Sequence, residues 1–241
     1  MKNFIVFFIV ILIVSNIAYS QKKSKYTSAR EKIFFGLSVG PSIPESDFAN
    51  KEYSVNSGYA KVGYKIQGYG GINIFSSFGI SILGFTNFNS TDPENLKTYI
   101  TGQYPDNNWV ANSKSWQLYG GMGGISFYYP MGKSVSLDFK IMSGLLSAKS
   151  PEILFQAGNN SYKLESATAN SFSYMTSIGL NFYVGQNVSL TGSVDFMRSE
   201  PNFTNVKNTA TINGNVTETT SSFYREINII NIMLGFRYSI R

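Results

Sequence analysis

The segment Ile178–Phe196, with the sequence IGLNFYVGQNVSLTGSVDF, decides the fold of this chain. Apolar residues share one phase in each half of it: Ile178, Leu180, Phe182 and Val184, then Val188, Leu190, Val194 and Phe196. Because successive side chains of a strand point to opposite faces, each half has one apolar and one polar face. The residues Gly185-Gln186-Asn187 between the halves favour a turn. The segment therefore predicts an amphipathic β-hairpin.

The same alternation recurs along the rest of the chain. It predicts strands over residues 33–43, 61–74, 78–88, 115–129, 134–146, 171–184, 187–197 and 223–241. Short turns join some of these strands, and the polar segments 44–60, 89–113, 147–170 and 198–222 join the others. An even strand count with alternating short and long connections is typical of transmembrane barrels. We predict an all-β fold, an eight-stranded antiparallel up-and-down transmembrane β-barrel with three short periplasmic turns and four longer extracellular loops.

A soluble lipocalin-like barrel would show the same alternation, so the direction of the apolar face has to be argued separately. The apolar face carries large residues such as Phe139, Phe182 and Phe236, and the other face carries small and charged residues. Eight strands leave an interior that side chains just fill. Small residues with a few long charged ones suit that interior, which favours an apolar face turned outward to lipid.

The N-terminal region predicts export. Residues 1–20 have a positive Lys2, an apolar run from Phe4 to Val14, and small residues Ala18 and Ser20 before Gln21, which is typical of a cleaved signal peptide. The apolar run is too short for a spanning helix. We expect residues 21–32 to form a flexible basic lead-in and residues 33–241 to form the barrel.

Composition excludes several classes of chemistry. The chain has no Cys and no His, which removes Cys–His and Ser–His catalysis and the commonest metal ligands. The glycine-rich residues 120–124 lie inside a predicted strand and are not a phosphate-binding loop. The positive net charge is partly concentrated in the lead-in, where it predicts a solvated tail rather than a nucleic-acid site. We expect no enzyme activity, no cofactor, no metal site and no nucleic-acid partner.

Charged residues on the polar face are the candidate site. They are Lys61, Lys65, Asp138, Lys140, Asp195 and Arg237. Each would be costly alone in a low-dielectric interior and tolerable in an ion pair, so we expect a charge network, with Lys140 or Arg237 as a partner of Asp195. Two interpretations stay open: a polar core that plugs the barrel, or a path for ions or solutes.

Four segments give the chain a family resemblance. They are the signal peptide, the first strand Phe35–Pro41, the turn Tyr129-Pro130-Met131-Gly132 and the closing strand GFRYSIR. It resembles the small outer-membrane β-barrels of Gram-negative bacteria, similar in architecture to OmpA/OmpX-type barrels and to PorT-like proteins. It departs from them in ending with Ile240-Arg241 rather than an aromatic residue. The resemblance implies a place in the cell outer membrane, contact with its lipid, and the barrel-assembly machinery as a partner during biogenesis.

The leading functional hypothesis is a non-enzymatic integral outer-membrane barrel with a polar, side-chain-filled lumen. It would act as a structural or surface-interaction protein, with envelope protein partners reached through the long loops. One alternative is a narrow pore or transporter for small solutes. Another is a component of a secretion or envelope-assembly complex.

Overall fold

A closed antiparallel β-barrel forms the body of the protein. The computed structural model describes residues 32–51, 57–75, 77–105, 108–132 and 134–240, so the predicted signal peptide and nearly all of the basic lead-in lie outside the described residues. The barrel strands are β1 (Ile33–Glu45), β2 (Gly63–Asn73), β3 (Phe78–Asn89), β5 (Trp116–Pro130), β6 (Val135–Lys149), β9 (Thr168–Tyr183), β10 (Val188–Ser199) and β13 (Ile227–Ile240). Pairing of β1 with both β2 and β13 closes the barrel, which confirms the predicted eight-stranded antiparallel β-barrel.

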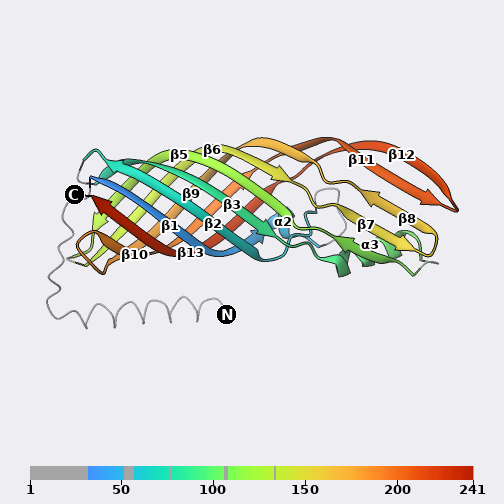
Figure 1. The fold of residues 1–241 in the computed structure, drawn as a ribbon, viewed down its shortest axis with the longest axis horizontal. Coiled ribbons are helices and arrows are strands. Elements are labelled where there is room, and N and C mark those ends of the chain that lie inside the picture. Colours follow the sequence, from blue (N-terminus) through green and yellow to red (C-terminus); the bar gives the residue numbers. More distant parts are fainter. Residues whose placement is uncertain (1–31, 52–56, 76, 106–107, 133, 241) are drawn as a thin grey trace.

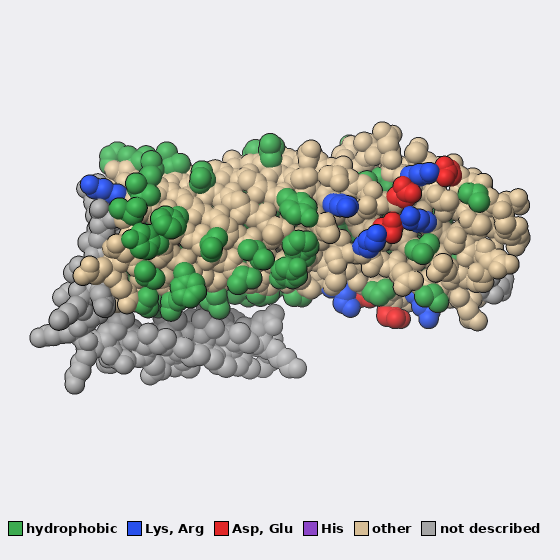
Figure 2. Space-filling view, viewed as in Figure 1, with side chains coloured by type: hydrophobic (Ala, Val, Ile, Leu, Met, Phe, Trp, Pro, Cys, Tyr) green, Lys and Arg blue, Asp and Glu red, His purple; other side chains and the backbone are tan. Residues whose placement is uncertain are grey.

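The apolar face of every barrel strand points outward. Leu37, Leu234 and Phe236 expose 64–70% of their surface, while their sequence neighbours Ser38 and Arg237 are buried. Figure 2 shows hydrophobic side chains spread over the barrel surface, whereas most charged side chains lie at the end of the molecule beyond the barrel. An outward apolar belt around a closed barrel is the arrangement that a lipid environment stabilises.

Beyond one end of the barrel stands a second sheet, which was not predicted. It contains β4 (Val110–Ser113), β7 (Ile153–Ala157), β8 (Asn160–Leu164), β11 (Asn202–Ile212) and β12 (Asn215–Tyr224), in the order β12-β11-β8-β7-β4. We call it the distal sheet, and Figure 1 shows it continuing the long axis of the barrel. Most of its residues fall in segments that the sequence predicted as polar loops. The barrel therefore has a turn end, with the short connections, and a loop end, which carries the distal sheet.

Two short helices accompany the distal sheet. Helix α2 (Ser46–Ala49) buries Phe48 completely, and α3 (Pro93–Gln103) buries Leu96 and Ile100. The start of α3 carries the usual signals, with Asp92 as the N-cap residue and Pro93 in the first turn. Burial alone would raise the pKa of Asp92, but hydrogen bonds from Asn95 and Lys51 outweigh that effect and hold its pKa below the usual value.

The interior differs from the predicted polar lumen, because its loop end is apolar. A continuous buried cluster there includes the side chains of Phe48, Trp116, Leu118, Leu146, Met175, Met197, Phe203, Ile227 and Ile229. The Trp116 ring lies 5.4 Å from the Phe48 ring and 5.8 Å from the Phe203 ring, both edge-on. The cluster arises because a closed barrel has to be filled to close packing, and flexible Met side chains fill irregular gaps well.

Candidate functional site

Lys65 and Asp195 form a buried ion pair inside the barrel. Their Nζ–Oδ2 distance is 3.1 Å, and their side chains are 0% and 1% exposed. The hydroxyls of Ser177 and Ser193 also donate to Oδ1 of Asp195, at 2.7 and 3.0 Å. Lys65 projects from β2 and Asp195 from β10, two strands that are not neighbours in the barrel. The pair therefore bridges the lumen from one wall to another.

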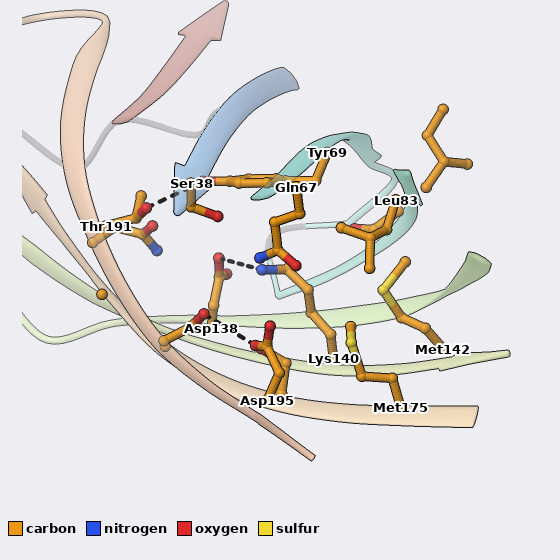
Figure 3. A pocket seen from close by; sticks show the side chains of 17 residues that line it. Ser38, Gln67, Tyr69, Leu83, Asp138, Lys140, Met142, Met175, Thr191 and Asp195 are labelled. Atoms are coloured by element: carbon orange, nitrogen blue, oxygen red, sulfur yellow. Dashed lines mark hydrogen bonds and ion pairs between the residues drawn. The ribbon is translucent and has the colours of Figure 1, made fainter. Parts of the chain in front are cut away.

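A second buried cluster lies beside the first. Nη1 of Arg237 lies 2.7 Å from Oδ2 of Asp138, and Nζ of Lys140 lies 3.5 Å from the same oxygen. The Arg237 guanidinium also lies 3.7 Å from the centre of the Phe34 ring, and the Lys140 ammonium 5.1 Å from that of Tyr69. Figure 3 shows Asp138, Lys140 and Asp195 around one small space. Five of the six candidate residues thus lie in the lumen.

The expectations for Lys61 and for the partner of Asp195 were wrong. Lys61 is 49% exposed on its side chain and lies 3.9 Å from Asp92, outside the lumen. Its position has the interior phase of β2, but the strand begins only at Gly63, so Lys61 precedes the barrel wall. Asp195 pairs with Lys65, and Arg237 pairs with Asp138. Alternation assigns a residue to the lumen but does not set its height there, which depends on the stagger of the strands.

The space between the two clusters is very small. Its volume is about 20 Å³, and its lining includes Tyr69, Asp138, Lys140 and Asp195. Such a space holds about one water molecule. Toward the turn end, hydrogen bonds fill the lumen: the Tyr128 and Tyr183 hydroxyls contact each other, and Ser136 lies 3.1 Å from the Tyr183 oxygen. Toward the loop end lies the apolar cluster, so side chains occupy the lumen along its length.

A much larger cavity lies outside the barrel, between α3 and one face of the distal sheet. Its volume is about 440 Å³, within the range of pockets that bind small molecules. Five aromatic residues line it: Tyr99, Tyr104, Trp109, Phe155 and Tyr162. A neighbouring cavity of about 220 Å³ shares Tyr99, Phe155 and Tyr162 with it. Burial, and to a smaller extent the Tyr104 hydroxyl, raises the pKa of Tyr162, which keeps that phenol protonated.

Charge separates the two faces of the distal sheet. On one face, Glu152 lies 3.1 Å from Lys114 and 3.2 Å from Lys163, and Lys207 lies 2.8 Å from Glu218. The Lys114 and Lys163 hydrogen bonds to Glu152 hold the pKa of that carboxyl below its usual value. The other face carries the row Ala111, Phe155, Tyr162 and Ala210, paired strand to strand. The last three of these residues line one wall of the large cavity.

This cavity was not predicted, because residues 89–113 were expected to form a polar loop. The helix start at Asp92-Pro93 and the spacing of Leu96 and Ile100 were readable signals of α3. Within the described ranges, no cluster of three or more acidic residues could hold a metal ion. Neither α2 nor α3, the helices of the described residues, has the length and apolar character of a membrane-spanning helix.

Comparison with known proteins supports the fold. No protein-family model matches the sequence, and no curated protein matches it. Among solved structures, a major outer membrane protein of Thermus thermophilus aligns over 86% of this chain and 99% of its own, with a TM-score of 0.51 and 10% identity. This chain has the fold of an outer-membrane β-barrel.

Two further barrels align with lower scores. Neisserial surface protein A covers 86% of this chain and 97% of its own, with a TM-score of 0.48 and 10% identity. The attachment invasion locus protein of Yersinia pestis, Ail, covers 87% of this chain and 99% of its own, with a TM-score of 0.42 and 15% identity. At identities this low, the function of the chain has to be argued from its own residues.

Proposed function

We propose that this outer-membrane barrel is a closed, non-enzymatic membrane anchor that holds the distal sheet outside the cell as a surface-interaction module. One observation carries the proposal. The lumen is crossed by the Lys65–Asp195 pair and the Asp138–Arg237 pair, and only about 20 Å³ remains between them. A hydrated ion needs a continuous path, and these buried pairs are held by contacts that a path would have to break.

The non-enzymatic part of the proposal is supported by composition and geometry. Without His or Cys, acid–base chemistry at neutral pH would depend on carboxylates, Lys or Tyr. The two lumen carboxylates, Asp138 and Asp195, are each paired with a cation inside a space too small for a substrate. Their roles in this proposal are structural, because they order the strands that face each other across the lumen.

Conductance across a planar lipid bilayer tests the closed lumen. Purified protein whose folded state is verified by heat-modifiable gel mobility should give no stable, discrete channels. Reproducible unitary conductance would overturn the closed-lumen proposal and would favour the narrow-pore alternative. A Lys65→Ala variant shortens the side chain that crosses the lumen. It should also give no channels, unless this single side chain is what blocks a path through the wild-type barrel.

The membrane orientation can be tested with introduced cysteines, since the natural chain has none. Thr217→Cys places a thiol on exposed β12 of the distal sheet, and Gln186→Cys places one on the exposed turn between β9 and β10. A membrane-impermeant maleimide should label the first variant in intact cells and the second only after the outer membrane is permeabilised. The reverse pattern would contradict the orientation. Lipid, the barrel-assembly machinery during biogenesis and envelope proteins are the partners that this orientation implies.

A further inference from the structure

The large cavity beside the distal sheet combines aromatic surfaces with polar groups and has no charged residue in its lining. Ile100, Trp109 and Phe155 are at least 93% buried and form its floor. Tyr104 and Tyr162 are 57% and 37% exposed and form its rim. The Trp109 indole nitrogen donates to the backbone oxygen of Tyr104 at 3.2 Å, which fixes the position of this ring.

Several polar groups of the lining make no hydrogen bond with another residue of the described chain. These are the hydroxyls of Tyr104, Ser161, Tyr162 and Thr211 and the amide nitrogen of Asn160. The oxygen of the Asn160 amide accepts a hydrogen bond from the backbone nitrogen of Asn213 at 3.0 Å, which orients its nitrogen as a donor. The cavity therefore offers both donors and acceptors next to flat aromatic faces.

This chemistry selects among ligand classes. A charged ligand would lose water without gaining an ion pair, because the lining carries no charge. A wholly apolar ring would cover aromatic surface but would also cover the free hydroxyl and amide groups, which is unfavourable. A neutral hexose ring satisfies both demands, since its C–H faces pack on aromatic rings and its hydroxyls hydrogen-bond at the edges.

We propose that the cavity between α3 and the distal sheet binds a neutral hexose ring, carried either on a free oligosaccharide or on a glycan of a neighbouring surface. The inference deepens the proposed surface-interaction role and rests on the distal sheet facing outward. Trp109 is the reporter, because of the two tryptophans in the chain it alone lines this cavity, whereas Trp116 lines the smaller neighbouring one.

The test uses folded full-length protein in a detergent that has no sugar headgroup, and it follows Trp109 fluorescence. The neutral sugars titrated are methyl glucoside, methyl galactoside, N-acetylglucosamine, maltose and lactose, and naphthalene and sialic acid are titrated as the apolar and charged alternatives. A single small ring in such a cavity should bind with a dissociation constant of about 1 mM. Ala210→Phe places a ring in the cavity and should weaken binding at least about tenfold. Thr209→Phe is the matched control. Thr209 directly precedes Ala210 but faces the other side of the sheet, where it pairs with Lys163 and Glu218 on the charged face. Tyr104→Ala, which changes only the rim, should also weaken binding.

Binding of at least one neutral sugar that is lost in Ala210→Phe and kept in Thr209→Phe supports the proposal. The proposal fails if no sugar of the panel changes Trp109 emission, if naphthalene or sialic acid binds and the neutral sugars do not, or if Ala210→Phe binds as the wild type does. A cell-binding assay with and without competing methyl glycoside separates the two sources of the hexose ring. Cell binding that the glycoside inhibits indicates a surface glycan, and the absence of such binding indicates a free oligosaccharide. Since titration uses purified protein, its result is independent of the cysteine-labelling test of orientation.

Discussion

Replacing Lys65 by Met should destabilise the barrel by about 3 kcal/mol. Coulomb's law with an effective dielectric constant of about 20 gives an attraction of about 5 kcal/mol at the 3.1 Å separation of Lys65 and Asp195. Removal of one partner of a buried pair costs about 3–5 kcal/mol, because the other charge stays buried. The lower end of this range applies here, since Ser177 and Ser193 still donate to the Asp195 carboxylate.

The measurement is urea-induced unfolding in lipid vesicles, followed by gel mobility and tryptophan fluorescence. Adding Asp195→Asn to the Lys65→Met variant removes the carboxylate charge that is buried without its lysine. This should restore about 2 kcal/mol of the free energy of unfolding. Lys207→Met is the control: its partner Glu218 is as close, at 2.8 Å, but both side chains are exposed, so the free energy of unfolding should not change measurably. A loss below about 1 kcal/mol for Lys65→Met, or no recovery in the double variant, would refute the reasoning.

Three further predictions concern packing and pH. Gly40→Ala should lower the free energy of unfolding by about 1–3 kcal/mol, because a Cβ there would overlap the backbone oxygen of Ile232. Gly84→Ala, with open space around it, should be neutral. Trp116→Ala should cost about 3–5 kcal/mol in the same unfolding assay. Asp92 contributes stability above its unfolded pKa of about 3.9, and this contribution is lost as the pH falls through its lower folded value. Acid should therefore loosen the start of α3 and change Trp109 fluorescence, and Asp92→Asn should abolish that change.

Each of these three has a distinct contrary outcome. Equal stabilities of the two glycine variants would show that strand spacing at Gly40 adapts to a methyl group. A Trp116→Ala variant within about 1 kcal/mol of the wild type would mean that the apolar cluster repacks around the cavity. An unchanged acid transition in Asp92→Asn would assign that transition to another carboxyl group.

The barrel could be predicted from the sequence because apolar residues recur at every second position over most of each strand. In β6, for example, Leu137, Phe139 and Ile141 alternate with residues that the structure places inside. The outward side needs large apolar residues for lipid, and the inward side has little room, so the two faces differ sharply in composition. That contrast is what made the strands and their outward face readable.

The distal sheet lacks such a contrast. Strand β12 is exposed on nearly every residue, so its Thr, Ser and Asn residues carry no hydrophobic period. One local signal was available: Asn213-Gly214, both at positive φ, forms the turn between β11 and β12, and this dipeptide is a strong hairpin signal. Pairing of β11 with β8 joins residues 44 to 50 positions apart and could not be predicted from local pattern.

The charge pairing inside the lumen was only partly predictable. Alternation identified Lys65, Asp138, Asp195 and Arg237 as inward residues, but it did not pair Asp195 with Lys65. Those two residues are 130 positions apart and meet only because the barrel closes and its strands are staggered. The mixed interior was also hidden, since Met175 and Met197 share the phase of the small polar residues around them.

The closing seam between β1 and β13 has a consequence for biogenesis. Ile33 pairs with Ile240, so the contact that completes the barrel joins strands nearly the whole chain apart. Until β13 docks, β1 and β10 each present a row of unpaired backbone groups, which lipid cannot satisfy. Folding of such non-local topology is slow, so a nascent chain must be sheltered until its last strand is in place. A stop codon that removes β13 should then leave a chain that is degraded rather than a smaller barrel.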